Sequence, residues 1–167
     1  MPHGAASWSF EEADAKRIEQ LLHSFLYESN ARCVLLVDRT GQLITLAGER
    51  PAFDSTAFAS LAAADFSAND QLASMIGEQE FSSLFHQGEK ESMYLADIAR
   101  RVILVVLFDD RATLGMIRIK VRHVVRELSE IFTELFRRLS SRSPATRLES
   151  AWADEAEDEI DRLFGSR

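Results

Sequence analysis

The spacing of apolar and polar residues predicts a β-sheet that helices cover on both faces. The longest apolar run, Val102–Phe108, contains no polar residue and four β-branched ones. A run this uniform is typical of a strand that is buried on both faces. Residues 116–121 follow after a polar turn and alternate between apolar and polar positions, which predicts another strand. We therefore expect 102–108 and 116–121 to form a hairpin at the centre of the sheet.

Three other segments complete a predicted five-stranded, mostly antiparallel sheet. Residues 33–37 are apolar, and 42–47 return after a turn in which Gly41 can adopt a positive φ at little cost. Residues 81–88 are interpreted as a connector. Residues 92–99 are then the third strand along the chain. We expect this strand at an open edge of the sheet, where it needs pairing or protection.

Helical periodicity predicts three helices around this sheet. The first covers 9–29, begins with a capping box at Ser9 and ends at Asn30, a residue that tolerates a left-handed conformation. The second covers 55–76 and the third covers 122–139. Five strands and three helices in the order α-β-β-α-β-β-β-α predict a two-sided α/β (α+β) sandwich.

The second helix carries an unusual set of small residues. Plotted at 100° per residue, Phe58, Leu61, Leu72 and Ile76 fall together and are expected to face the sheet. The opposite arc is small, polar and uncharged, and its members are Ser60, Ala63, Ala64, Ser67, Gln71 and Ser74. Because small residues let another backbone come close, this arc is a candidate contact face. It would meet either a second copy of the helix or another protein.

The chain beyond the third helix is predicted to be a separate element. Residues 141–148 form a linker and 149–167 form an acidic amphipathic helix, while residues 1–8 are expected to be flexible. The apolar side of the C-terminal helix consists of Trp152, Ala156, Ile160, Leu163 and Phe164. An exposed apolar stripe usually marks an interaction site. Two alternatives are a solubilising end and docking onto the chain's own basic residues Arg118, Lys120 and Arg122.

Composition excludes several classes of function. The net charge is −8, so the basic footprint that nucleic acid requires is missing. No apolar segment approaches the roughly 20 residues of a membrane span, and no secretion signal is apparent. Cys33 is the only cysteine, so no internal disulfide can form, and the expected location is the cytoplasm. The four histidines lack metal-binding spacing and no glycine-rich phosphate loop is present, so we expect no metal, cofactor or catalytic residue.

Several stretches, taken in this order, resemble roadblock-type domains. The matching stretches are 36–43, 60–64, 77–81, 85–90, 93–95 and 107–115, and 159–164 resembles the C-terminal helix of such proteins. The resemblance covers nearly the whole chain. It implies a roadblock-type sandwich over residues 9–140, followed by the C-terminal amphipathic helix.

The resemblance implies a regulator of a GTPase and not an enzyme. Such proteins are homodimers whose third strands pair edge to edge, which assigns dimerisation here to Met93, Tyr94 and Leu95. Two protomers bind one small Ras-like GTPase of cell polarity and motility. They stimulate GTP hydrolysis by remodelling its active site without an arginine finger. The cytoplasm is the implied location, with a cell pole as a narrower alternative.

The same resemblance assigns two surfaces to the GTPase. The first is the small face of the second helix, with Ser60, Ala63, Ala64, Ser67 and Gln71. The second is the C-terminal helix, which would dock on the GTPase and influence nucleotide exchange.

Three other interpretations stay open. The chain could be a scaffold that tethers a GTPase or a motor component without changing its turnover. A small-molecule sensor would need a ligand cavity, of which the apolar strands and helices give little sign. An arginine finger is worth about 10³–10⁵ in GTP hydrolysis, and the candidates are Arg100, Arg101 and Arg111. Each of these arginines lies in a predicted turn, where solvation is the expected role.

Overall fold

The computed structural model describes residues 10–142, and the chain divides into two compact units between Ile131 and Phe132. The described elements are α1 (Glu12–Ser29), β1 (Cys33–Asp38), β2 (Leu43–Gly48), α2 (Ser55–Met75), β3 (Ser83–Gln87), β4 (Ser92–Ile98), β5 (Val102–Phe108) and α3 (Leu114–Arg142). The predicted order α-β-β-α-β-β-β-α is confirmed.

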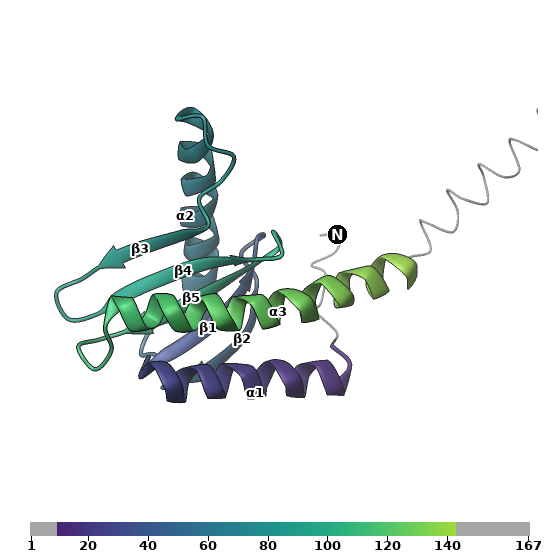
Figure 1. Cartoon of the computed structure of the whole chain (residues 1–167), viewed down its shortest axis with the longest axis horizontal. Coiled ribbons are helices and arrows are strands. Elements are labelled where there is room, and N and C mark those ends of the chain that lie inside the picture. The colour runs from purple at the N-terminus through teal and green to yellow at the C-terminus, as the bar shows by residue number, and fades with distance from the viewer. Residues whose placement is uncertain (1–9, 143–167) are drawn as a thin grey trace, which may run out of the picture. The chain divides into compact units, whose positions relative to one another are not determined.

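An antiparallel sheet of five strands lies at the centre of the first unit. Its strand order is β2-β1-β5-β4-β3. Strand β5 lies in the middle, and all 7 of its residues are buried. Figure 1 shows α2 on one face of the sheet and α1 with the first part of α3 on the other. The predicted two-sided sandwich is therefore confirmed, and so is the burial of β5 on both faces.

Alternate residues of the central strands fill two separate cores. Leu35, Val37, Ile103 and Val105 pack in one cluster with the buried residues of α2. Successive side chains of a strand point to opposite faces, so the intervening residues face α1 and α3. These are Val34, Leu36, Leu104 and Val106, all with no exposed surface. Each such burial contributes about 1.5–3 kcal/mol to folding, so β1 and β5 hold the two layers of helices together.

Helix α3 begins at Leu114, so the predicted strand at 116–121 is wrong. The hydroxyl of Thr113 accepts a hydrogen bond from the N–H of Met116 at 3.3 Å, which caps the helix. A stripe of buried residues at helical spacing follows, made of Ile117, Val121, Val124, Leu128 and Ile131. The segment 116–121 is so short that its apolar positions fit both the period of a strand and the period of a helix. The predicted central hairpin is also wrong, because β5 pairs with β1 and β4.

The remaining strand is β3, in the segment 81–88 that was interpreted as a connector. It pairs with β4 and, among the described residues, no strand lies on its other side. Strand β4 is therefore an interior strand. The prediction that Met93, Tyr94 and Leu95 form an open edge is wrong, because these residues already pair with β3 on one side and β5 on the other.

Helix α1 ends as predicted but begins later. Asn30 has the left-handed angles φ 56° and ψ 23°, and its N–H donates to the carbonyl of Leu26 at 3.1 Å. The N-cap is Glu11, whose side chain makes no capping hydrogen bond. The predicted start of the helix at residue 9 is therefore too early, and the predicted capping residue Ser9 lies outside the described residues.

The turn between β1 and β2 is held by Asp38. Its Oδ1 accepts hydrogen bonds from the N–H groups of Thr40 (2.9 Å) and Gln42 (3.0 Å). Gly41 has φ 95°, and a Cβ added there would lie 3.0 Å from the Cα of Ser60 in α2. The predicted positive φ is confirmed, and the close approach of α2 is a second reason for glycine at this position.

The described part of the second unit is the end of α3, residues 132–142. The ring centroids of Phe132 and Phe136 lie 6.0 Å apart, and Arg137 donates to Glu134 at 2.8 Å. The helix includes residues 141 and 142, which were predicted to begin the linker. The C-terminal docking helix and residues 1–8 lie outside the described residues. Within 10–142, no helix is both long and apolar enough to cross a membrane.

Candidate functional site

Helix α2 packs its smallest residues against the sheet. Asp54 is its N-cap, and the carboxylate accepts hydrogen bonds from the N–H groups of Thr56 (2.9 Å) and Ala57 (3.3 Å). The buried stripe consists of Ala59, Ala62, Ala63, Phe66, Asn69 and Ala73. Alanines bring the helix axis close to β1 and β5, so one phenylalanine is enough to fill the remaining space.

The predicted orientation of α2 is therefore wrong for its large residues. Leu61 is 70% exposed, Leu72 58%, Met75 83% and Ile76 71%. Only Phe58 of the predicted sheet-facing set packs against the core. These exposed residues, with the exposed Ala68, form one continuous strip of the helix, which we call the apolar face. A solvated helix would carry charged residues there, so this strip is a candidate interaction surface.

A second strip, the small face, lies beside the apolar face. It consists of Ser60, Ala64, Ser67 and Gln71, all exposed. These are four of the five residues predicted to bind a GTPase. The fifth, Ala63, is only 5% exposed and belongs to the core that faces the sheet, so it is not available to a partner in this chain. The small face carries no charged residue, and the one charged residue beside the apolar face is Asp65.

The apolar face lies toward the free edge of β3. Asp65, at the border of this face, contacts His86 of β3, with 2.6 Å between Oδ2 and Nε2. The N–H of Asp97 donates to the carbonyl of Ser82 at 3.3 Å. Bonding alternates along an antiparallel ladder, so the backbone groups of Ser83, Phe85 and Gln87 point away from β4. The apolar face and a row of backbone donors and acceptors thus lie next to each other.

The small face lies toward the turn between β1 and β2, where Arg39 anchors α2. The guanidinium of Arg39 donates to Asp70 of α2 and to Asp97 of β4, and it lies 4.8 Å from the centre of the Phe66 ring. Partial burial lowers the pKa of Arg39, but the hydrogen bonds to Asp97 and Asp70 outweigh it and the pKa is raised. Arg39 therefore stays charged and holds α2 to two strands.

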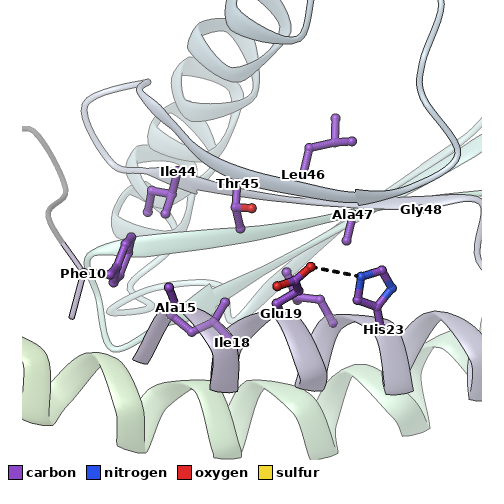
Figure 2. Close-up of a pocket in the computed structure, with 11 residues that line it drawn as sticks. Phe10, Ala15, Ile18, Glu19, His23, Ile44, Thr45, Leu46, Ala47 and Gly48 are labelled. Atoms are coloured by element: carbon purple, nitrogen blue, oxygen red, sulfur yellow. Dashed lines mark ion pairs between the residues drawn. The ribbon is translucent and has the colours of Figure 1, made fainter. Parts of the chain in front are cut away.

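An open groove of about 550 Å³ lies on the other face of the sheet, between α1 and β2 (Figure 2). Phe10, Ile18 and Leu22 line it from the helix side, and Ile44 and Ala47 from the strand. Its rim carries an ion pair between Glu19 and His23 at 3.7 Å. Polar and apolar groups contribute in similar measure to the lining of this groove.

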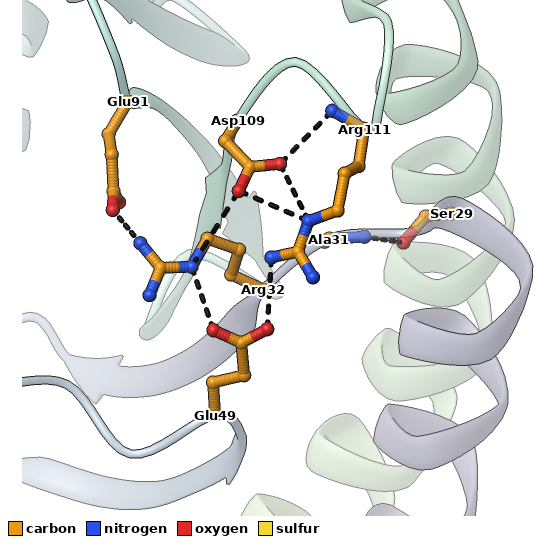
Figure 3. Close-up of polar contacts among 7 residues, drawn as sticks. All are labelled: Ser29, Ala31, Arg32, Glu49, Glu91, Asp109 and Arg111. Carbon is orange, nitrogen blue, oxygen red and sulfur yellow. Dashed lines mark hydrogen bonds and ion pairs between the residues drawn. The ribbon is translucent and has the colours of Figure 1, made fainter.

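Arg111 is held by carboxylates in a surface cluster (Figure 3). Its guanidinium donates to Asp109 at 3.0 Å and to Glu49 at 2.9 Å. Arg32 contacts the same two carboxylates and also Glu91. Hydrogen bonds from Arg111 hold the pKa of Asp109 below its ordinary value, and hydrogen bonds from Arg32 and Arg111 do the same for Glu49. To act as an arginine finger, Arg111 would have to break its contacts with both carboxylates.

The other candidate groups also have structural roles. Arg100 donates to Glu80 at 3.3 Å, and Arg101 closes the β4–β5 turn through its N–H to Ile98. Cys33 is 3% exposed, and burial raises the pKa of its thiol, as expected of a core cysteine. Among residues 10–142, no three His, Cys, Asp or Glu side chains are placed to hold a metal ion.

A family model for the Roadblock/LC7 domain matches residues 17–108. The solved structure of Myxococcus xanthus MglB is 41% identical, with a TM-score of 0.71, and the match covers 76% of this chain and 95% of that chain. Gliding protein MglB from Thermus thermophilus is 29% identical, with a TM-score of 0.71, over 77% of this chain and 97% of that chain. A structure of MglB with a tetrameric arrangement is also 29% identical, with a TM-score of 0.71, over 77% and 96%.

Proposed function

Because the chain belongs to the Roadblock/LC7 family, we propose that it is a homodimeric activator of a small Ras-like GTPase of the MglA type. Two protomers bind one GTPase and stimulate GTP hydrolysis, and the chain itself supplies neither a catalytic residue nor a cofactor. The complex acts in the cytoplasm, at a cell pole. The observation that carries this proposal is the broad, exposed and uncharged surface of α2, in a chain 41% identical to MglB.

Dimerisation uses the β3 edge and the apolar face of α2. The free edge of a strand is a template for pairing with another chain, and a two-fold axis beside β3 would join two sheets into one. The same axis would bring the two apolar faces together, since Asp65 and His86 place that side of α2 next to β3. The tetrameric arrangement reported for an MglB supports self-association in this class of protein.

The GTPase binds the small face. Once the apolar faces are paired, the small face remains exposed on each α2, together with Ser74. The short side chains of Ser60, Ala64 and Ser67 let a partner's backbone approach closely and cost little conformational entropy. Arg39 and Asp54 hold this helix at its two ends, which keeps the surface rigid.

Stimulation proceeds without an arginine finger. The two carboxylates on Arg111 and the Glu80 partner of Arg100 support this proposal. A remodelling mechanism requires only a rigid surface that favours the catalytic conformation of the partner, because a ligand shifts an equilibrium by its differential affinity for the two states. The C-terminal helix would then dock separately on the GTPase and alter nucleotide exchange.

A single-turnover GTP hydrolysis assay tests the proposal. An MglA-type GTPase loaded with GTP is mixed with increasing amounts of this protein, and phosphate release is followed. We expect the rate to rise and to saturate at two protomers per GTPase. Saturable binding without any change in rate would instead identify a scaffold, and an absence of binding would refute both functions.

A further inference from the structure

The first part of α3 carries a concentration of positive charge in an acidic chain. Residues 114–126 contain no Asp or Glu, and their basic side chains are Arg118, Lys120, Arg122 and Arg126. The chain as a whole has a net charge of −8. Figure 1 shows the beginning of α3 beside the end of α1, and Lys120 donates to Glu28 of α1 at 2.6 Å. The positive charge therefore lies on the face of the sheet away from α2 and the proposed GTPase surface.

Three arginines of this segment are exposed and have no partner in the described part of the chain. They follow one another at intervals of four residues along α3, as Arg118, Arg122 and Arg126. Within residues 10–142 none of them makes an ion pair or a side-chain hydrogen bond. By contrast, Arg32, Arg39 and Arg111 each contact at least two carboxylates. The charge of the α3 arginines is therefore available to a partner outside the sandwich.

Apolar side chains are exposed on the same surface. Ile119 is 57% exposed and shares the outer face of α3 with Arg122 and Arg126. Tyr27, near the end of α1, is 88% exposed. Proteins that lie on a membrane combine basic residues, which attract anionic lipids, with apolar and aromatic side chains that enter the headgroup region. The composition of this surface fits an anionic bilayer.

The space between α1 and α3 offers little room for a protein partner's side chains. The hollow between these helices measures only about 80 Å³, and Leu21, Phe25 and Val124 are among its lining residues. An amphipathic helix binds by placing its apolar anchors in a groove, whereas a bilayer requires only exposed side chains at one level. The small size of the hollow therefore favours a bilayer over a peptide.

Dimerisation would double this surface, a step that rests on the proposed function. In each protomer α1 and the first part of α3 lie on the opposite face of the sheet from α2 (Figure 1). A two-fold axis that joins the β3 edges and pairs the α2 helices on one side places both α1–α3 layers on the other side. The two basic surfaces would then face the same way, and a bilayer could bind both at once.

We propose that the outer surface of α1 and the first part of α3 binds a lipid bilayer that contains anionic phospholipid. Arg118, Arg122 and Arg126 lie at the lipid phosphates, and Ile119 and Tyr27 enter the headgroup region. The acidic remainder of the chain is repelled by the same lipids, which fixes the orientation. The small face of α2 then points away from the membrane and stays open to the GTPase.

Co-sedimentation of the full chain with vesicles tests the proposal. No GTPase is present, so the result is independent of the proposed activation of GTP hydrolysis. We expect binding to phosphatidylcholine vesicles with about 30% phosphatidylserine, and at least about tenfold weaker binding to phosphatidylcholine alone. One basic residue near such a surface contributes roughly fivefold in affinity. The triple variant Arg118→Gln, Arg122→Gln and Arg126→Gln should therefore bind on the order of 100-fold more weakly, with its circular dichroism unchanged.

The matched control removes the same charge from exposed positions outside α1 and α3. Its substitutions are Arg50→Gln, Lys90→Gln and Arg100→Gln, and its vesicle affinity should stay within about threefold of the unchanged protein. Equal losses from the two triple variants would show that only net charge matters and would overturn the proposal. Equal binding to both kinds of vesicle, or to neither, would overturn it as well.

Two further measurements separate the bilayer from acidic polypeptides. If the surface binds poly-L-glutamate more tightly than it binds the vesicles, its partner is an acidic protein and the proposal is wrong. The proposal is also wrong if vesicles bind only after residues 146–167 are deleted, because the chain's own acidic segment then occupies the surface. Vesicle binding by the full chain that exceeds binding to poly-L-glutamate supports the bilayer.

Discussion

At the scale of single residues, Arg39 joins three elements that are distant in the sequence. It contacts Asp70 of α2 and Asp97 of β4, and its side chain retains 26% exposure. Its Nε and the Oδ1 of Asp70 are buried without a hydrogen-bond partner, so these atoms of the cluster are shielded from solvent. The position of α2, and with it the proposed GTPase surface, depends on this arginine.

Replacing Arg39 by methionine should destabilise the fold by about 2–3 kcal/mol. Removing one partner of a fully buried pair costs about 3–5 kcal/mol, and partial exposure reduces this figure. Urea unfolding followed by circular dichroism at a fixed protein concentration measures the loss. Arg100→Met is the matched control, because Arg100 is 72% exposed beside Glu80 and should cost less than about 1 kcal/mol. Equal losses from the two variants would contradict an anchoring role for Arg39.

At the scale of elements, α2 presents a polar and an apolar strip to solvent and buries four of its alanines against the sheet. A Leu residue normally marks the buried side of a helix, and this rule fails for α2. The side chains between a helix and a sheet determine how closely the two can pack. The four buried alanines of α2 permit a close approach. The larger residues are then left for a partner.

Ser67→Arg should abolish GTPase capture while the fold remains intact. A long charged side chain on the small face blocks close approach, and a central interface change typically costs 2 kcal/mol or more, about 30-fold in affinity. GTP turnover and a binding isotherm measure the effect. Gln20→Arg adds the same group on the exposed side of α1, across the sheet, and should leave both unchanged. Full stimulation by Ser67→Arg would place the GTPase on another surface.

Ser83→Pro should weaken the dimer by at least about tenfold. The N–H of Ser83 points away from β4, so proline removes a donor from the free edge but none from the ladder within the chain. Light scattering during size-exclusion chromatography gives the mass as a function of concentration. Ser83→Ala also removes the hydroxyl but keeps the N–H, so it should remain dimeric. If both variants dimerise equally, β3 is not the pairing edge.

At the scale of the whole molecule, the C-terminal segment is expected to act apart from the sandwich. Deleting residues 146–167 should leave the dimer and its circular dichroism intact but change nucleotide exchange on the GTPase. Exchange of a fluorescent nucleotide and GTPase affinity are the measurements. The variant Ile160→Ser with Leu163→Ser and Phe164→Ser keeps every acidic residue and should reproduce the deletion. If the deletion changes nucleotide exchange but the triple variant does not, the effect is due to the acidic charge of the segment. If neither variant changes exchange or affinity, the segment does not dock on the GTPase.

The sequence by itself determined the first four elements in their order, the end of α1 at Asn30, the turn at Gly41 and the burial of β5. Each of these follows from local period or from the conformational preference of one residue. The roadblock-type family could also be identified from the stretches that match it. Only the tertiary structure decided that 83–87 is an edge strand, that 116–121 is helical and that β4 is interior. It also decided which side of α2 is hidden. These outcomes depend on which segments pair across the sheet and on how closely helix and sheet approach each other. Neither the pairing nor the distance produces a periodic pattern of apolar residues in the sequence.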